Sequence, residues 1–121
     1  MTTPSYVSLS IARADHLAEV TLLGPGKGNR MGPDFWREMS PAFAALDADP
    51  NVRAIVLRGS GALFSSGLDL MAMASEVGPA MATGGLATDR LQLLAQIELM
   101  QNAISAVERC RKPVIAAITG W

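Results

Sequence analysis

A short apolar run that opens into a glycine- and serine-rich loop, and then into a helical segment, constrains the fold of this chain most strongly. Residues 54–57 read Ala-Ile-Val-Leu, and residues 64–70 read Phe-Ser-Ser-Gly-Leu-Asp-Leu. Gly67 can adopt a positive φ without steric cost, so the chain can turn sharply there. A strand, a tight loop and a helix start in this order aim free backbone N–H groups outward, where they can hold negative charge on an oxygen. A turn that binds no ligand is the open alternative, because Gly/Ser turns are common.

Two segments before this loop have clear periodicity. Apolar and polar residues alternate on both sides of Asp15-His16, which predicts an antiparallel hairpin over residues 6–23 with an exposed turn at His16. Residues 33–47 have helical spacing, and the predicted inward face consists of Phe35, Met39, Phe43 and Leu46. Pro41 is expected to kink this helix, because it removes one backbone hydrogen bond.

The second half of the chain is predicted to alternate between helices and apolar strands. A short helix at 70–74 is followed by the glycine- and alanine-rich stretch 77–85, which we expect to be a mobile loop. Thr88 is expected to cap a helix over 89–109 that is more buried than most. Its predicted inward stripe runs through Leu91, Leu94, Ile97, Gln101, Ile104 and Glu108, and Leu93, Leu99, Met100, Ala103 and Val107 widen the apolar surface. The apolar runs 52–58 and 114–118, separated by helices, are typical of buried parallel strands. The order β-β-α-β-α-α-β predicts an α/β fold.

Composition excludes several classes of function. The chain has 121 residues, enough for one domain, and its net charge of −1 comes without a basic patch that would suit nucleic acid. No apolar run is long enough to span a membrane, and residues 1–4 do not resemble a signal peptide, so we expect a cytoplasmic protein. Cys110 cannot form an internal disulfide, and with His16 as the one histidine no metal site is expected.

The loop at residues 24–30, Gly-Pro-Gly-Lys-Gly-Asn-Arg, is a second candidate for ligand binding. It is not a P-loop, because Lys27 is followed by glycine and not by serine or threonine. Lys27 and Arg30 could still contact a phosphate, but a plain surface loop is favoured on the residues alone. Asp69 and Glu76 are the carboxylates nearest the Gly/Ser loop, and nothing in the sequence places them on one substrate.

Taken together, five segments resemble the enoyl-CoA hydratase/isomerase (crotonase) family in order and spacing. They are residues 27–31, 35–39, 52–59, 64–70 and 112–120. The longer run 66–76, Ser-Gly-Leu-Asp-Leu-Met-Ala-Met-Ala-Ser-Glu, looks most like the dienoyl-CoA isomerase branch. The resemblance implies a crotonase-like α/β fold, in which β-β-α turns repeat along a superhelix. Residues 1–121 would form a truncated N-terminal portion of such a domain.

The resemblance also implies ligands and site residues. The implied ligands are enoyl- or dienoyl-CoA thioesters, with no cofactor besides the coenzyme A of the substrate. The backbone N–H of Leu68 would be the first oxyanion donor to a thioester enolate. The residues that would line the acyl-CoA site are Ser66, Gly67, Leu68, Asp69 and Leu70, together with Lys27 and Asn29 near the coenzyme A. Lys27 would be a phosphate contact, although Gly28 and Arg30 depart from the family's usual pattern.

In the family, a second oxyanion donor and the acid/base carboxylates follow the strand that ends here at Gly120. We therefore expect an N-terminal fragment whose full-length parent isomerises or hydrates acyl-CoA thioesters and assembles as a trimer or hexamer. The alternative is a non-catalytic module that binds acyl-CoA or docks on another protein. A structural α/β domain that binds nothing ranks last.

Overall fold

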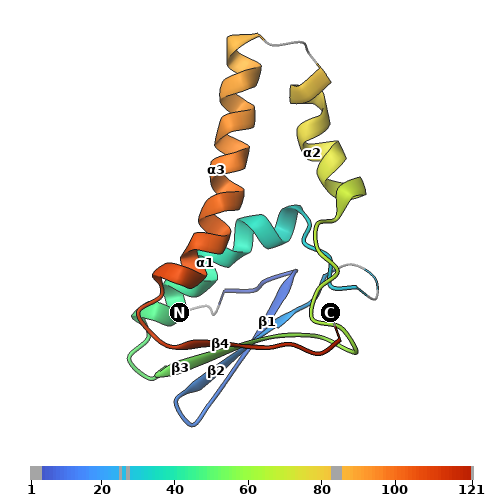
Figure 1. Cartoon of the computed structure of the whole chain (residues 1–121). Coiled ribbons are helices and arrows are strands. Elements are labelled where there is room, and N and C mark those ends of the chain that lie inside the picture. The colour runs from blue at the N-terminus through green and yellow to red at the C-terminus, as the bar shows by residue number, and fades with distance from the viewer. Residues whose placement is uncertain (1–3, 25, 27, 83–85, 121) are drawn as a thin grey trace.

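The computed structural model describes residues 4–24, 26, 28–82 and 86–120 (Figure 1). Within them the order of elements is the predicted one. The elements are β1 (Leu9–Ala14), β2 (Leu17–Leu22), α1 (Pro33–Ala48), β3 (Ala54–Gly59), α2 (Leu70–Ala82), α3 (Ala87–Arg109) and β4 (Val114–Ala117).

The four strands form one mixed sheet in the order β1-β2-β3-β4. β1 and β2 are antiparallel, with Leu9 opposite Leu22, and β3 is parallel to both β2 and β4. Asp15 and His16 make the hairpin turn with φ angles of 51° and 66°, as a tight two-residue connection requires. The hairpin, the exposed position of His16 and the parallel pairing of the later strands are therefore confirmed.

The core lies between one face of the sheet and α1. All four residues of the predicted inward face of α1 are buried, and the sheet contributes Leu9, Ala18, Val20, Leu22 and Ile55. The helix continues through Pro41, which is exposed. Lys112 caps the C-terminal end of α1, where its Nζ donates to the carbonyls of Leu46 and Asp49.

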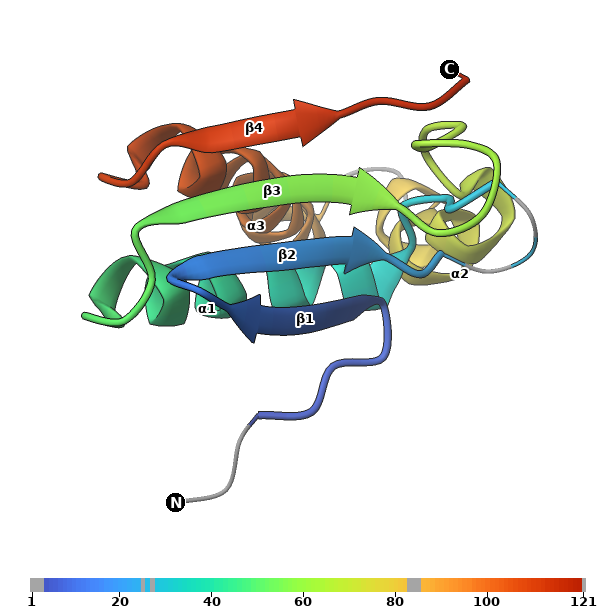
Figure 2. The ribbon, with the colours of Figure 1, turned by 90° about the horizontal axis from the view of Figure 1, so that it is seen from below.

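The helices α2 and α3 rise together away from the sheet, on the side where α1 lies (Figures 1 and 2). The predicted loop at 77–85 is wrong for residues 77–82, which extend α2 from the expected 70–74 to Ala82, while residues 83–85 lie outside the described part. Alanine and methionine are strong helix formers, and they carry the helix past Gly78 and Pro79. Among the described residues, no helix is long and apolar enough to cross a membrane.

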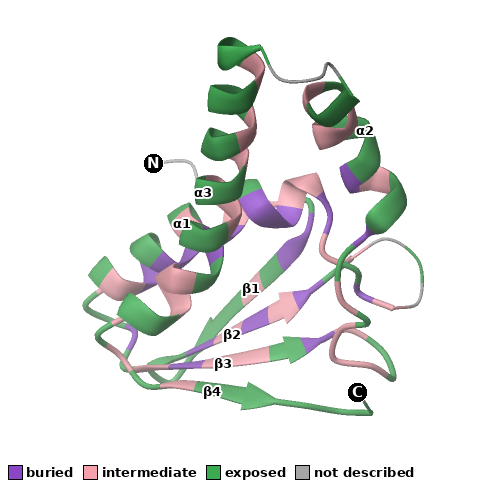
Figure 3. Cartoon of the chain, turned by 45° about the horizontal axis from the view of Figure 1, so that its top comes forward, coloured by how far each residue is buried: buried purple, intermediate pink, exposed green. Residues whose placement is uncertain are grey.

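The structure corrects three expectations for α3. The residue at its N-cap is Leu86, with no side-chain hydrogen bond, so the predicted Thr88 cap is wrong. The helix is mostly exposed, and its one buried residue is Ala103 (Figure 3). The predicted stripe through Leu91, Leu94, Ile97 and Ile104 faces outward, because α3 packs on the core through Met100, Ala103, Ala106 and Val107.

β4 is also less buried than expected. Its first residue, Val114, packs against the core, but Ile115 is 60% exposed and Ile118, just beyond the strand, is 64% exposed. β4 lies last in the order of the sheet, and among the residues that the structure describes its one neighbouring strand is β3. An apolar strand at a sheet edge exposes the side chains that a further strand or layer would cover.

Candidate functional site

The site predicted from the sequence is built where two loops run side by side. One loop connects β2 to α1, and the other connects β3 to α2. The Ser66 N–H donates to the Gly28 carbonyl at 2.7 Å, and the Met31 N–H donates to the Gly67 carbonyl at 2.8 Å. The Met31 N–H bond and a bond from the Asp69 N–H to the Met31 carbonyl at 3.0 Å form a short parallel bridge between Met31 and Leu68, so the loops hold each other in register.

The direction of the Leu68 N–H follows from this bridge. Leu68 nitrogen and Gly67 oxygen belong to the same planar trans peptide, so they point in opposite directions. The Gly67 oxygen is turned toward Met31, and the Leu68 N–H is therefore turned away from that loop. No hydrogen-bond acceptor meets this N–H among the residues that the structure describes.

Gly67 makes the turn that presents this peptide. Its φ of +97° lies in the region that side chains of L-residues rarely adopt. The Gly67 N–H donates to the Ser65 Oγ at 3.1 Å, and that hydroxyl donates to the Asn29 carbonyl at 2.9 Å. Ser65 and Met31 are thus residues that the sequence reasoning did not single out, although both lie in segments that carry the family resemblance.

Asn29 braces the two loops. It is 2% exposed, with a φ of +47°. Its Nδ2 donates to the carbonyls of Ser60 at 2.8 Å and Leu63 at 2.9 Å, and its Oδ1 accepts the Ser60 hydroxyl at 2.8 Å. In the structure, the side-chain amide of Asn29 bonds to other protein atoms, so a contact with coenzyme A stays a prediction.

The other predicted site residues lie close to the turn. Ser66 is exposed, and its Oγ donates to the Gly28 carbonyl at 3.0 Å. Leu68 is 37% exposed and Leu70 72%, whereas Asp69 is 7% exposed and bonds to the first turn of α2. Lys27 lies outside the described residues. The structure therefore brings together the predicted site residues that it describes, which are Asn29 and residues 66–70.

A cleft of about 330 Å³ lies beside the turn. Asp69 and Ala72 line it from the start of α2, and Arg30 and Phe35 line it from the neighbouring loop and helix. Arg30 is exposed, which leaves its guanidinium accessible to an anionic group. No group of histidine, cysteine and acidic residues that could hold a metal ion occurs among the described residues.

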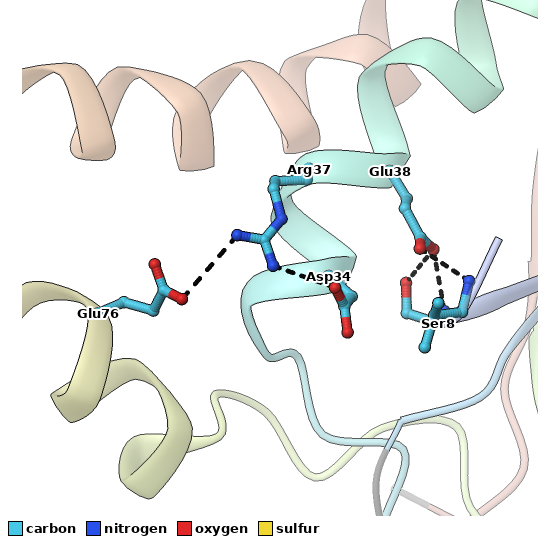
Figure 4. Close-up of polar contacts among 6 residues, drawn as sticks. Ser8, Asp34, Arg37, Glu38 and Glu76 are labelled. Atoms are coloured by element: carbon cyan, nitrogen blue, oxygen red, sulfur yellow. Dashed lines mark hydrogen bonds and ion pairs between the residues drawn. The ribbon is translucent and has the colours of Figure 1, made fainter.

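Polar contacts join α1 to its neighbours on both sides (Figure 4). Arg37 bonds to Asp34 at 3.1 Å and reaches Glu76 of α2 at 3.9 Å. On the other side, the carboxylate of Glu38 accepts the backbone N–H groups of Val7 and Ser8 and the Ser8 hydroxyl, at 2.6–2.9 Å. The Asp69 carboxylate bonds to the Ala72 N–H and that of Glu76 pairs with Arg37, so the structure does not pair these two carboxylates with each other.

The end of the described chain returns to the same region. The Phe64 N–H donates to the Thr119 carbonyl at 2.9 Å, beyond the end of β4. Gly120, with a φ of +69°, lies against Ala62 and Leu63. The segment after β4 therefore runs beside the loop that carries Leu68.

Comparison with known proteins identifies this arrangement. The model of the family "Enoyl-CoA hydratase/isomerase" matches residues 12–121. The chain belongs to this family. Its fold is crotonase-like: a crystal structure of an enoyl-CoA hydratase/isomerase from Xanthobacter autotrophicus Py2 superposes with a TM-score of 0.73 and 28% identity, over 96% of this chain and 40% of that one.

Several of the curated relatives are dienoyl-CoA isomerases. The human mitochondrial Delta(3,5)-Delta(2,4)-dienoyl-CoA isomerase is 39% identical over 96% of this chain and 35% of its own length. The peroxisomal enzyme of Arabidopsis thaliana is also 39% identical, over 99% of this chain and 44% of its length. The chain thus spans less than half the length of these relatives. Their names place them in mitochondria and peroxisomes, and give no support to the expected cytoplasmic location.

Proposed function

We propose that this chain binds enoyl- or dienoyl-CoA thioesters and that the backbone N–H of Leu68 donates to the thioester carbonyl oxygen. The observation that carries the proposal is the N–H of Leu68, which meets no acceptor in the described part of the chain and is held outward by a peptide whose carbonyl is bonded to Met31. Family membership supplies the class of ligand. Coenzyme A would enter as part of the substrate, with no separate cofactor.

The chemistry follows from where charge develops. Removing a proton next to a thioester moves electron density onto the carbonyl oxygen, and a donor already aimed at that oxygen lowers the barrier. Loss of one such donor typically costs about 10²–10³ in rate. A backbone donor needs no special side chain, which suits a turn made of serine, glycine and leucine.

The rest of the ligand would lie along the two loops. We propose that residues 66–70 line the thioester end and that Lys27 and Arg30 contact the phosphates of coenzyme A. Arg30 is exposed at the mouth of the adjoining cleft, which supports this orientation.

We propose the reaction itself, isomerisation or hydration, for a longer protein of this family that contains this segment. Acid/base carboxylates and a second donor would come from residues outside this sequence, and the return of the chain at Thr119 supports a second donor beside Leu68. A homo-oligomer of three or six subunits is proposed for that longer protein as well.

A titration with matched ligands tests the binding proposal. Octanoyl-CoA should bind the 121-residue chain and shift the amide resonance of Leu68. The thioether S-octyl-CoA lacks the carbonyl oxygen, so it should bind about fivefold more weakly and leave that resonance unmoved. Equal binding of both ligands, or a ligand-induced shift that spares Leu68, would contradict the proposal.

A non-catalytic acyl-CoA-binding or interaction module is the second candidate, since the chain spans 35% of the length of the human relative. Absorbance assays with an enoyl-CoA and a dienoyl-CoA separate the two roles. Binding without turnover supports the module for this chain, whereas turnover would show that residues 1–121 contain a working acid/base group.

A further inference from the structure

Asp69 directly follows Leu68 and precedes the first turn of α2. Its hydrogen bonds join the loop between β2 and α1 to that turn. Its N–H donates to the Met31 carbonyl at 3.0 Å, and its carbonyl accepts the Met73 N–H at 2.9 Å. Its carboxylate Oδ1 accepts the Ala72 N–H at 3.1 Å, which is the bond of an N-cap residue to the third residue of its helix. Asp69 is therefore bonded both to the neighbouring loop, at Met31, and to the first turn of α2.

Little else holds this end of α2. Leu70 and Met71 are 72% and 82% exposed, and Met73 is the one residue of the described helix that is buried. The ion pair between Arg37 and Glu76 joins exposed side chains at 3.9 Å, and pairs of this kind contribute little. With so little packing, the first turn depends on its cap.

We propose that Asp69 is a positioning residue of the acyl-CoA site, whose side chain caps α2 and so keeps the Leu68 N–H pointing outward. The inference rests on the proposed function only where Leu68 is taken to meet the thioester oxygen. The two backbone bonds with Met31 fix the peptides on either side of Leu68, and the cap holds the first turn of α2 where the chain leaves the second of these peptides. Asp69 acts through this geometry and makes no contact with the reacting atoms.

Three substitutions separate a cap from a charged contact. Asp69→Ala removes the acceptor and should weaken octanoyl-CoA binding about fivefold, the factor expected from a lost cap. Asp69→Asn keeps an amide oxygen that caps equally well and should lose at most twofold. Asp89→Ala removes an acidic residue from the first turn of α3, away from the loops, and should leave binding unchanged.

A second measurement needs no ligand. In the free protein, the Leu68 amide resonance should move in Asp69→Ala and stay in place in Asp69→Asn, and exchange of the Ala72 amide hydrogen should accelerate only in the alanine variant. Should Asp69→Ala fail to fold, Asp69→Gly also lacks the acceptor but costs a helix start far less.

The outcomes distinguish this inference from the proposed function. If Asp69→Asn loses as much affinity as Asp69→Ala, the negative charge itself contacts the ligand and the inference is wrong. It is also wrong if Asp69→Ala, or Asp69→Gly in its place, binds like the wild type with the Leu68 resonance unmoved. If the wild type binds no octanoyl-CoA, the proposed function fails for this chain, and the resonances of the free variants still decide the role of Asp69.

Discussion

At the scale of single residues, Asn29 carries the junction of the two loops. Its amide makes two donor bonds and accepts one, all to the loop between β3 and α2. The positive φ of +47° suits asparagine better than most residues. Sequence alone marks this position as part of a loop, and its role depends on partners that only the folded chain brings near.

Asn29→Ala should destabilise the protein by about 2–4 kcal/mol, because three hydrogen bonds of a buried side chain are lost and two carbonyls of half-buried residues lose this donor. Urea unfolding followed by circular dichroism measures the change. Asn51→Ala is the matched control, since Asn51 is exposed and the hydrogen bonds it makes with described residues use its backbone. This variant should stay within about 0.5 kcal/mol of the wild type. An equal loss of unfolding free energy in both variants would show that the side-chain hydrogen bonds of Asn29 do not stabilise the two loops.

Leu68 offers a test of a main-chain role. Leu68→Pro deletes the N–H and should weaken octanoyl-CoA binding at least fivefold, whereas Leu68→Ala keeps the donor and should bind nearly as well as the wild type. Calorimetric titration of both folded variants decides the matter. A comparable loss in the alanine variant would mean that the leucine side chain, and not the amide, contacts the ligand.

At the scale of elements, an ion pair between Asp47 of α1 and Arg111, which precedes β4, shifts the pKa of both side chains. Arg111 donates to Asp47 from its backbone N–H at 2.8 Å and from its Nε at 2.9 Å. These hydrogen bonds hold the pKa of Asp47 below its ordinary value, and they raise the pKa of Arg111. The pair joins the end of α1 to the segment that leads into β4.

A depressed carboxyl pKa stabilises the fold above the ordinary value of about 3.9, and the contribution disappears as the pH falls through the lowered pKa. Arg111→Gln should therefore unfold at a lower urea concentration than the wild type at pH 5, and the two midpoints should converge as the pH is lowered through the depressed pKa of Asp47. Arg58→Gln removes a surface arginine paired elsewhere, with Glu19, and serves as the control for charge. A constant gap between the midpoints across this range would contradict the assignment.

At the scale of the whole molecule, apolar surface remains open on β4 and along α3. Ile115 and Ile118 are 60% and 64% exposed, and β4 is paired on one side. An exposed apolar strand at an edge promotes pairing between chains.

Ile115→Thr combined with Ile118→Thr should raise the solubility of the 121-residue chain and lower its association in light scattering. The free energy of unfolding should change by less than about 1 kcal/mol, because neither side chain is buried. Val114→Thr is the contrasting variant, since Val114 packs against the core and its replacement should destabilise the fold. Unchanged association in the double variant would show that this edge is not what brings chains together.

Local patterns in the sequence predicted the order of elements, the hairpin, the inward face of α1 and the turn at Gly67. Each depends on residues within a few positions of one another, where side-chain periodicity and backbone preference act directly. The outward stripe of α3, the brace at Asn29 and the direction of the Leu68 N–H depended on the tertiary structure. These features arise from contacts between distant segments, such as the bonds of Asn29 to residues 31 and 34 positions away, and no local pattern encodes them.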